Sequence, residues 1–332
     1  MDGAGKRRAL VLGATGGIGG EAAAALLRHG WQVVAMARDP GAGAQRTGAL
    51  AGAKQAGPLA GAEWVAGDAM QAGDVRRAAE GAEAIVHAVN PPGYRGWGKL
   101  VLPMIDNTVA AAEAVGARIV LPGTVYNYGP DAFPVLKEDS PQRPVTEKGR
   151  IRVELERRLE AASRDGAAAL IVRFGDFFGP APGNNWFSQG LVTPGKRLAA
   201  VTYPGEKGVG HAWAYLPDAG EAVARLLDRS GALEPFARFH FGGEWDADGT
   251  AMVRAVAEGV GRPDIRVKRL PWALLGLAGL FAETPRELGK MRYLWRAPVR
   301  LDNSRLVAFL GEEPHTPLGE AVRRTLGALK VS

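Results

Sequence analysis

The sequence predicts an α/β protein, with a Rossmann-type doubly wound parallel sheet and a smaller C-terminal substrate-side region. Short apolar runs typical of strands alternate with alanine-rich helical runs in the first half of the chain. A glycine-rich turn joins the first apolar run to the first helical run, and after Gly179 the alternation gives way to short segments interrupted by glycine, proline and tryptophan. Strands linked by helices in this order form parallel sheets that bind ligands at the carboxyl ends of their strands.

The elements follow from the periodicity of the apolar residues. We expect strands at 8–12, 31–37, 63–66, 84–88, 117–121 and 169–173, and helices at 19–29, 72–80, 100–115 and 149–164. Residues 39–61 are rich in glycine, alanine and proline and predict a loop with a weak helix. The longest apolar stretch, 271–282, is shorter than the roughly 20 residues that span a bilayer, so we expect a buried helix or a lid over a pocket.

Composition excludes several classes of function. The net charge is +6, with 41 basic and 35 acidic residues, but the basic residues are spread out and form no run with interleaved aromatic residues. We therefore expect no nucleic-acid partner and only a mild attraction for anionic ligands. Without cysteine the chain has no disulfide and no thiolate nucleophile, and its five scattered histidines predict no metal site. The first apolar run is too short for a signal peptide, so a cytoplasmic protein without a membrane partner is expected.

A glycine loop carries the strongest functional signal. It lies between the first strand and the first helix, where glycine allows a tight turn and a close approach of the backbone to a pyrophosphate. The amino end of the helix then offers free N–H groups to the anion. This position predicts a dinucleotide site formed by Gly13, Thr15, Gly16, Gly17, Ile18 and Gly19.

The residue after the second strand indicates which dinucleotide binds. Arg38 stands where an NAD site would carry a carboxylate for the ribose 2′-hydroxyl, and an arginine there would pair with a 2′-phosphate. We therefore expect NADP(H), with NAD(H) left open. Asp68, after the third strand, is a candidate for the adenine amine or a residue of the turn alone.

The division of the chain follows the change in texture. Residues 1–179 plus about 211–229 are expected to form the dinucleotide-binding Rossmann domain, and 180–210 plus 230–332 the substrate-binding region.

These motifs resemble the extended short-chain dehydrogenase/reductase family, the group of nucleotide-sugar epimerases, dehydratases and related reductases. The resemblance covers most of the chain, through the glycine loop, Gly67-Asp68, and the segments 86–90, 122–129, 173–180 and 214–218. It implies that Ala88 and Asn90 lie along the cofactor ribose and that Thr124 takes the place of the catalytic serine or threonine. Members often pair through the helix that matches 149–164, which implies a homodimer as one option.

The chain departs from this family at the acid/base pair. With Glu156 in its usual place, Lys148 stands at the tyrosine position and Arg152 at the lysine position. Arg152 can still bond the nicotinamide ribose, but a lysine cannot replace a phenol unless it is buried. Tyr126 and Tyr128, beside Thr124, are substitute proton donors or packing residues.

Two histidines and a set of aromatic residues complete the candidates. His87 lies inside a strand and is expected in the core or behind the site, whereas His211 could face the cleft. The aromatic residues of the C-terminal half would either line a substrate site or form an ordinary core: Trp186, Phe187, Trp272, Phe281, Tyr293 and Trp295. An aromatic lining suits a flat or apolar carbonyl or alkene compound better than a nucleotide sugar.

Three functions follow from these residues. The first is an atypical NADP(H)-dependent oxidoreductase acting on a small organic substrate held against Thr124, with a loop tyrosine or a water positioned by Arg152 as the acid. The second is a non-catalytic NADP(H)-binding sensor or regulatory protein. The third is a nucleotide-sugar epimerase or dehydratase, which needs a base to deprotonate a hydroxyl.

Overall fold

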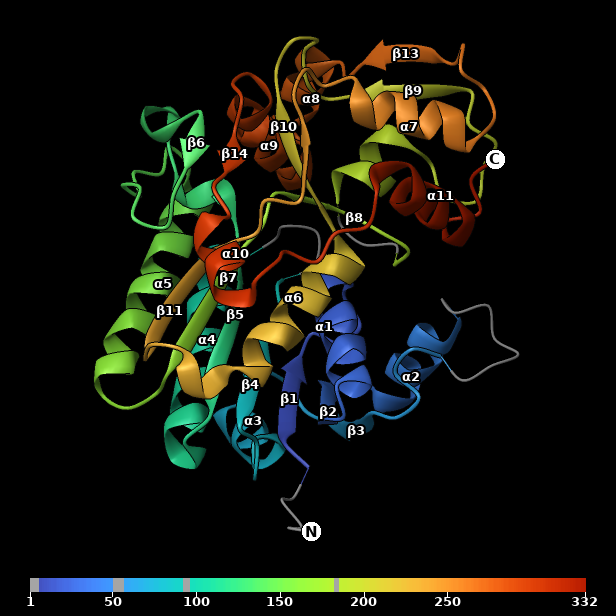
Figure 1. The fold of residues 1–332 in the computed structure, drawn as a ribbon. Coiled ribbons are helices and arrows are strands. Elements are labelled where there is room, and N and C mark those ends of the chain that lie inside the picture. Colours follow the sequence, from blue (N-terminus) through green and yellow to red (C-terminus); the bar gives the residue numbers. More distant parts are fainter. Residues whose placement is uncertain (1–5, 50–56, 92–95, 182–184) are drawn as a thin grey trace.

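The computed structural model describes all residues except 1–5, 50–56, 92–95 and 182–184. At its centre lies a parallel sheet with the strand order β11-β7-β5-β4-β1-β2-β3 (Figure 1). The order reverses between β1 and β4, which is where doubly wound sheets bind ligands. The predicted fold class is confirmed. The strands of this sheet are β1 (Arg8–Leu12), β2 (Gln32–Ala37), β3 (Glu63–Ala66), β4 (Ala84–His87), β5 (Arg118–Gly123), β7 (Ala169–Arg173) and β11 (Phe236–His240).

Helices cover both faces of the sheet, so its strands are buried on both sides (Figure 1). In β1, Ala9 and Val11 pack beneath α1 and α6, whereas Leu10 and Leu12 pack beneath α3, α4 and α5. This explains why the strands read as continuous apolar runs. The helices of this part are α1 (Gly17–Arg28), α2 (Pro40–Ala49), α3 (Ala72–Ala78), α4 (Trp97–Val115), α5 (Glu147–Arg164) and α6 (Leu216–Asp228).

The predicted elements are all present, and the differences concern their ends. Helix α1 begins two residues before the expected start, at Gly17, and α4 begins at Trp97 instead of 100. Helix α5 begins at Glu147 because the Thr146 hydroxyl accepts a hydrogen bond from the amide of Gly149, at 3.1 Å, and so caps it. The weak helix expected within 39–61 is α2.

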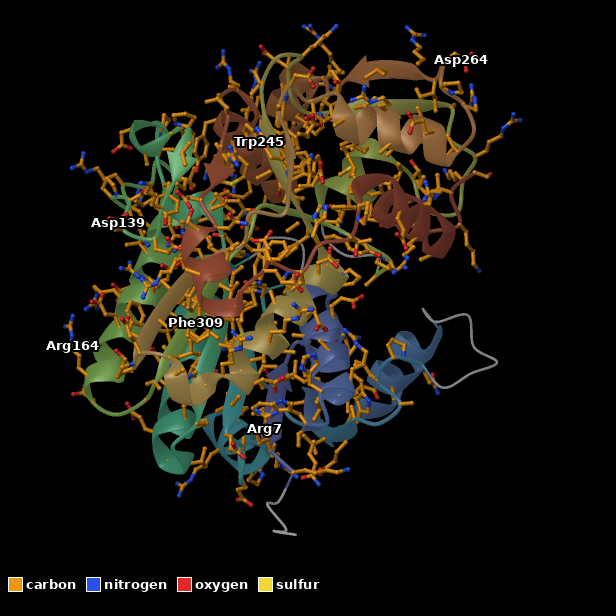
Figure 2. The ribbon with its side chains drawn as sticks, viewed as in Figure 1. Arg7, Asp139, Arg164, Trp245, Asp264 and Phe309 are labelled. Carbon is orange, nitrogen blue, oxygen red and sulfur yellow. The ribbon has the colours of Figure 1, made fainter. Side chains whose placement is uncertain are left out.

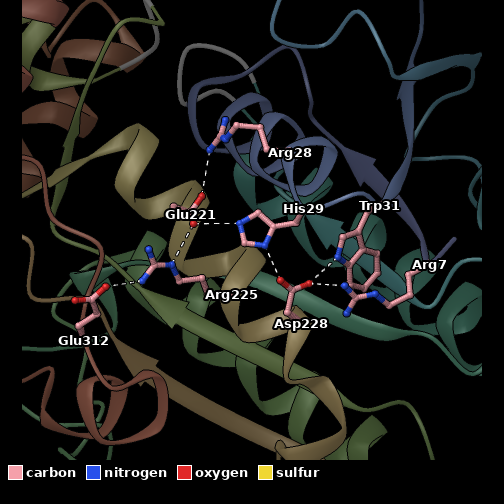
Figure 3. A network of polar contacts seen from close by, with 8 residues as sticks. All are labelled: Arg7, Arg28, His29, Trp31, Glu221, Arg225, Asp228 and Glu312. Atoms are coloured by element: carbon pink, nitrogen blue, oxygen red, sulfur yellow. Dashed lines mark hydrogen bonds and ion pairs between the residues drawn. The ribbon is translucent and has the colours of Figure 1, made fainter.

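Helix α6 packs against α1 at very close range. A Cβ added to Gly220 would lie 2.6 Å from the backbone of Glu21, so only glycine allows this approach. At the far end of the two helices, His29 lies between the carboxylates of Glu221 and Asp228, at 3.1 and 2.5 Å (Figure 3). The segment that follows β10 is thereby fixed to the first βαβ unit.

The rest of the chain lies beyond the carboxyl ends of the central strands (Figure 1). It contains three small sheets, with the orders β12-β10-β8, β13-β9 and β14-β6. Its strands are β6 (Val135–Leu136), β8 (Asp176–Phe178), β9 (Ala200–Tyr203), β10 (His211–Tyr215), β12 (Glu244–Asp246), β13 (Arg266–Arg269) and β14 (Arg300–Leu301), and its helices are α7 (Ala251–Gly259), α8 (Trp272–Ala278), α9 (Glu283–Lys290) and α11 (Leu318–Ala328). Helix α10 (Ser304–Leu310) packs on the central sheet instead.

The expected domain boundary needs one correction. Strand β11 and helix α10 fall within 230–332, which the sequence assigned to the substrate-binding region, yet β11 pairs with β7 in the central sheet. Leu306 and Leu310 of α10 belong to the same apolar core as α1 and α6. The ring centroid of Phe309, labelled in Figure 2, lies 5.3 Å from that of Phe239 in β11. The C-terminal chain therefore returns to the main body, and the remaining division stays a prediction.

The apolar stretch 271–282 also differs from expectation. Leu280 and Phe281 have 73% and 87% of their surface exposed, and Leu274 and Leu277 of α8 are more than half exposed. The expected buried helix is therefore wrong, because apolar sequence alone does not say whether a partner element covers it. Among the described residues, no helix is both long enough and apolar enough to cross a membrane.

Candidate functional site

The glycine loop lies at the point where the strand order reverses. Gly13 has a φ of +92°, and a Cβ there would lie 2.6 Å from the carbonyl oxygen of Ala88, in the loop after β4. A Cβ on Gly19 would lie 2.3 Å from the carbonyl oxygen of Gly13. The loops after β1 and β4 are thus in direct contact, as a dinucleotide crevice requires.

The amino end of α1 is open to an anion. The helix begins at Gly17 after Gly16, with no side-chain cap from the described residues and no acidic residue in its first turn. Its first N–H groups, on Gly17, Ile18 and Gly19, have no helical partner, since the ladder starts with Gly20. Thr15 is exposed beside them. This arrangement fits a pyrophosphate.

Arg38 and Asp68 lie at the neighbouring strand ends. Arg38 directly follows β2, is exposed, and makes no ion pair with any residue that the structure describes, so its guanidinium is available to a ligand. The Asp68 carboxylate accepts a hydrogen bond from the amide of Met70, at 3.0 Å, which holds the turn before α3. One Asp68 oxygen therefore stabilises the turn, which is one of the two roles that the sequence allowed for this residue.

Arg152 and Asn90 come together from distant parts of the chain. The Arg152 guanidinium donates to Oδ1 of Asn90, at 2.8 Å, and lies 5.1 Å from the ring of Trp97. Behind them His87 is buried, and its Nδ1 contacts the Thr108 hydroxyl at 2.8 Å. Burial and the nearby Arg152 lower the pKa of His87 to about 3, so it stays neutral, as expected of a residue behind the site.

Lys148, which the resemblance matches to the tyrosine position, is buried. Its Nζ lies 3.3 Å from a carboxylate oxygen of Glu287 in α9 and 5.3 Å from the ring of Trp97. Burial lowers the pKa of Lys148, against the opposing effect of Glu287. Lys148 does not contribute to the cleft wall formed by the described residues. It therefore links α5 to α9 and does not take over the phenol's position toward a substrate.

A cleft of about 790 Å³, including its open mouth, lies beside the switch point. It contains three of the predicted catalytic residues, Thr124, Tyr126 and Arg152, together with Asn90 from the predicted cofactor site. Aromatic rings form much of its wall. The lining is completed by Pro91, Trp97, Gly123, Val125, Phe174, Gly175, Asp176, Phe177, Asn185 and Trp186.

Tyr126 and Tyr128 differ in their position. Tyr126 lines the cleft from the short 3₁₀ turn at Val125–Asn127, whereas the Tyr128 side chain is fully buried and faces away. His240 Nδ1 contacts the carbonyl oxygen of Leu136 and must donate to it, so its Nε2 is an acceptor, which receives the Arg173 Nε–H at 3.3 Å and lies 3.4 Å from the Tyr128 hydroxyl. The expectation that Tyr128 serves the site is therefore corrected, because its side chain is buried and does not line the cleft.

A buried ion pair holds the loop that carries Thr124. Arg173, at the end of β7, binds Glu156 of α5 through two contacts of 2.8 and 2.9 Å. The same guanidinium donates to the carbonyl oxygen of Thr124 at 2.5 Å. Arg173 thereby ties the Thr124 backbone to the end of β7 and to α5, beside the cleft.

Gly149 brings α5 against the Tyr126 turn. A Cβ at this position would lie 2.2 Å from the carbonyl oxygen of Tyr126 and 2.5 Å from Cβ of Pro144. The first turn of α5 can lie directly on the turn at Val125–Asn127 only because this residue is glycine. Tyr126 and Arg152 consequently reach the same cleft.

Asp176 and His211 form a pair that the sequence analysis did not identify. Asp176 lines the cleft from β8, and its Oδ2 lies 2.8 Å from Nε2 of His211 in β10. The His211 ring is buried and stacked on Trp295, with centroids 3.8 Å apart. A carboxylate with an imidazole behind it can exchange a proton with a ligand. His211 thus acts behind the cleft wall and does not line it.

The predicted aromatic residues have different roles. Trp186 lines the cleft, whereas Phe187 and Trp295 are buried in the core of the C-terminal part. Tyr293 donates to the carbonyl oxygen of Tyr128 at 3.2 Å and packs with it. Within the described residues, no cluster of histidine, aspartate and glutamate could hold a metal ion.

Comparisons with known proteins identify a matching family and several similar structures. The model of the NAD dependent epimerase/dehydratase family matches residues 9–237. No relative is found among curated proteins. A candidate epimerase from Burkholderia cenocepacia J2315 has a TM-score of 0.74 at 18% identity, with 98% of both chains covered. UDP-glucuronic acid 4-epimerase from Bacillus cereus, in complex with NAD, has a TM-score of 0.71 at 16% identity, with 97% of this chain and 98% of that chain covered.

A third structure, the Bordetella bronchiseptica enzyme WbmH in complex with NAD⁺, has a TM-score of 0.67 at 19% identity, with 98% of this chain and 99% of that chain covered. At these identities the structures share the fold. The family match extends from the second residue of β1 to the second residue of β11, so it includes the glycine loop and the cleft. The chain therefore belongs to the NAD-dependent epimerase/dehydratase family, within the extended short-chain dehydrogenase/reductase group.

Proposed function

We propose that this protein is an NADP(H)-dependent oxidoreductase acting on a small organic substrate that carries a carbonyl group or an alkene. The observation that carries the proposal is the cleft, in which Thr124, Tyr126 and Asp176 meet aromatic walls beside the switch point. A lining that combines aromatic rings with polar groups suits a small, partly apolar ligand that carries a polar atom.

The residues present fit a dinucleotide. The N–H groups at the start of α1 would hold its pyrophosphate, and Asn90 with Arg152 would hold the ribose next to the nicotinamide. The family is named for NAD, and solved neighbours contain NAD. The preference for NADP(H) is the finer part of the proposal and depends on Arg38, whose guanidinium would pair with a 2′-phosphate.

When bound, the nicotinamide would supply or accept a hydride. The chain's own residues position the substrate and move a proton. The Thr124 hydroxyl would bond the substrate oxygen, while Tyr126 or the Asp176–His211 pair would exchange a proton with it. Arg152 keeps a positive charge beside the reacting end of the cleft.

The cofactor part is tested by isothermal titration with NADPH, NADP⁺, NADH and NAD⁺. The proposal expects tight binding of the phosphorylated pair and a loss of about tenfold or more in Arg38→Ala, since charged hydrogen bonds contribute about 1.5–3 kcal/mol. Arg164→Ala, an exposed arginine at the end of α5, is the matched control and should change nothing (Figure 2). Equal affinity for NADH and NADPH in the wild type would refute the NADP(H) preference.

The catalytic part is tested by NADPH oxidation with a panel of carbonyl and alkene compounds. Asp176→Asn and Tyr126→Phe should each lower turnover, and the variant that abolishes the basic limb of the pH profile identifies the proton donor. Retention of full turnover in both variants would show that neither residue exchanges the proton.

Two other functions each have an observation in their favour. The family match and the sugar-nucleotide epimerases among the solved neighbours favour a nucleotide-sugar epimerase or dehydratase. The absence of a phenol at Lys148 and its ion pair with Glu287 favour a non-catalytic NADP(H)-binding sensor. Turnover of a UDP-sugar would establish the epimerase or dehydratase. Cofactor binding without turnover of UDP-sugars, carbonyl compounds or alkenes would support the sensor.

A further inference from the structure

An exposed apolar surface lies on the C-terminal part of the molecule, away from the cofactor loop. It consists of residues 271–282, which contain no charged side chain. Leu274 and Leu277 are 65% and 57% exposed, and Leu280 and Phe281 are 73% and 87% exposed. Large apolar side chains gathered in this way mark a surface that meets a partner.

This surface is fixed to the body of the protein along one side. The indole N–H of Trp272 donates to the carbonyl oxygen of Pro204 at 2.9 Å, and its ring lies 5.9 Å from that of Trp186. At the other end, a Cβ on Gly279 would lie 2.9 Å from Cα of Arg286, so α8 and α9 are in close contact. Leu274 and Leu277 therefore belong to a supported helix, and Leu280 and Phe281 to the turn that joins it to α9.

Basic residues flank the apolar segment on both sides along the chain. Residues 266–296 contain seven bases against two acids, a surplus of five, where the whole chain has a surplus of six. The exposed strand β13 carries Arg266, Lys268 and Arg269 just before α8, and the Arg292 guanidinium lies 5.7 Å from the ring of Trp272. Figure 2 shows Asp264 before β13 at this outer edge.

One of the two acids contributes little negative charge. Glu287 is buried and forms ion pairs with Lys148 and Lys290, at 3.3 and 2.7 Å. Glu283 is half-buried at the start of α9. With the exposed Asp264 included, the exposed charge around the apolar surface remains net positive.

We propose that residues 266–296 dock the protein on an anionic phospholipid surface, with the leucines and Phe281 inserted among the acyl chains. Apolar residues inside a basic rim are the pattern by which proteins bind at the interface of an anionic bilayer without spanning it. A second copy of this chain is a poor occupant, because two-fold pairing would bring two basic rims together. The proposal revises the expectation of no membrane partner, because a surface can bind at a bilayer without a segment long enough to span it.

The proposal does not depend on the proposed reaction. It adds one geometric consequence, because Trp272 of the docking surface contacts Trp186, which lines the cleft. One wall of the cleft is therefore next to the surface that would meet the lipid.

Vesicle co-sedimentation tests the proposal with the full chain. Vesicles of phosphatidylcholine mixed with phosphatidylglycerol should carry the protein down, and vesicles of phosphatidylcholine alone should not. Raising the salt concentration should weaken binding, because the basic rim is screened. The variants Leu277→Glu/Phe281→Glu and Arg266→Glu/Lys268→Glu should each reduce binding by about tenfold or more.

Val145→Glu is the matched control, since Val145 is 55% exposed on the loop before α5 and lies outside the docking surface. All variants alter exposed side chains, and circular dichroism with cofactor titration checks that they fold. Failure to sediment with either vesicle would overturn the proposal. So would a dimer in solution that Leu277→Glu/Phe281→Glu dissociates, because a second copy would then occupy the surface.

Discussion

Substituting Gly149 by alanine tests the contact that brings α5 to the cleft. The added methyl group would lie 2.2 Å from the backbone carbonyl oxygen of Tyr126 and 2.5 Å from Cβ of Pro144, whose ring is tied to the backbone. Overpacking of this kind costs about 1–3 kcal/mol, and the upper value applies because backbone cannot rotate away. Alanine regains about 0.5–1 kcal/mol of helix propensity. We expect a net loss of about 2 kcal/mol in the free energy of unfolding.

Urea denaturation followed by circular dichroism measures this loss. Gly327→Ala in α11 is the matched control, because a Cβ there meets nothing within 4 Å, and it should be neutral or slightly stabilising. The separation of α5 from the Tyr126 turn should also weaken cofactor binding, since Arg152 lies one turn farther along α5. If both glycine variants had the same stability, the close contact would not be a constraint on the fold.

Three further outcomes follow from buried or paired groups. Glu156→Gln should lower the free energy of unfolding by about 3–5 kcal/mol in the same assay, because it leaves the buried Arg173 guanidinium without its counter-charge; a loss below 1 kcal/mol would show that water reaches the pair. Tyr128→Phe should cost about 1 kcal/mol of stability but leave cofactor affinity unchanged, and a changed affinity would contradict its position in the core. Burial alone would lower the pKa of His29, but the carboxylates of Asp228 and Glu221 outweigh it and raise the pKa above 6.5. The stabilisation from this charged histidine is therefore complete below about pH 6.5 and is lost as the pH rises through the raised pKa. Thermal melts of His29→Gln and wild type should accordingly converge above that range, and a constant difference would rule out this titration.

The sequence was sufficient for the parts of the fold that are determined locally. The strands β1, β3 and β7 have the predicted ends, because each is an apolar run bounded by polar or glycine residues. The glycine loop was also readable, since its function depends on backbone freedom that only glycine provides. Such signals lie within a few residues of one another.

The parts that the sequence did not predict depend on contacts between distant residues. Asp176 and His211 are 35 positions apart and meet because β8 pairs with β10, which no local pattern shows. Tyr126 and Tyr128 are two residues apart in one loop, and Tyr128 is buried by contacts with distant residues such as His240 and Tyr293. The run at β11 contains an arginine and a histidine, so it did not read as a strand of a buried sheet.

The position of β11 has a consequence for the order in which the chain acquires its structure during synthesis. The sheet remains incomplete until about residue 240 has left the ribosome, and α10 must follow before Phe239 is covered. Until then β7 presents an unpaired edge in which every residue except Arg173 is apolar, and such edges recruit other strands. A truncated chain that ends before Phe236 should therefore aggregate, although it contains the whole glycine loop. The C-terminal third is a folding requirement of the nucleotide-binding half.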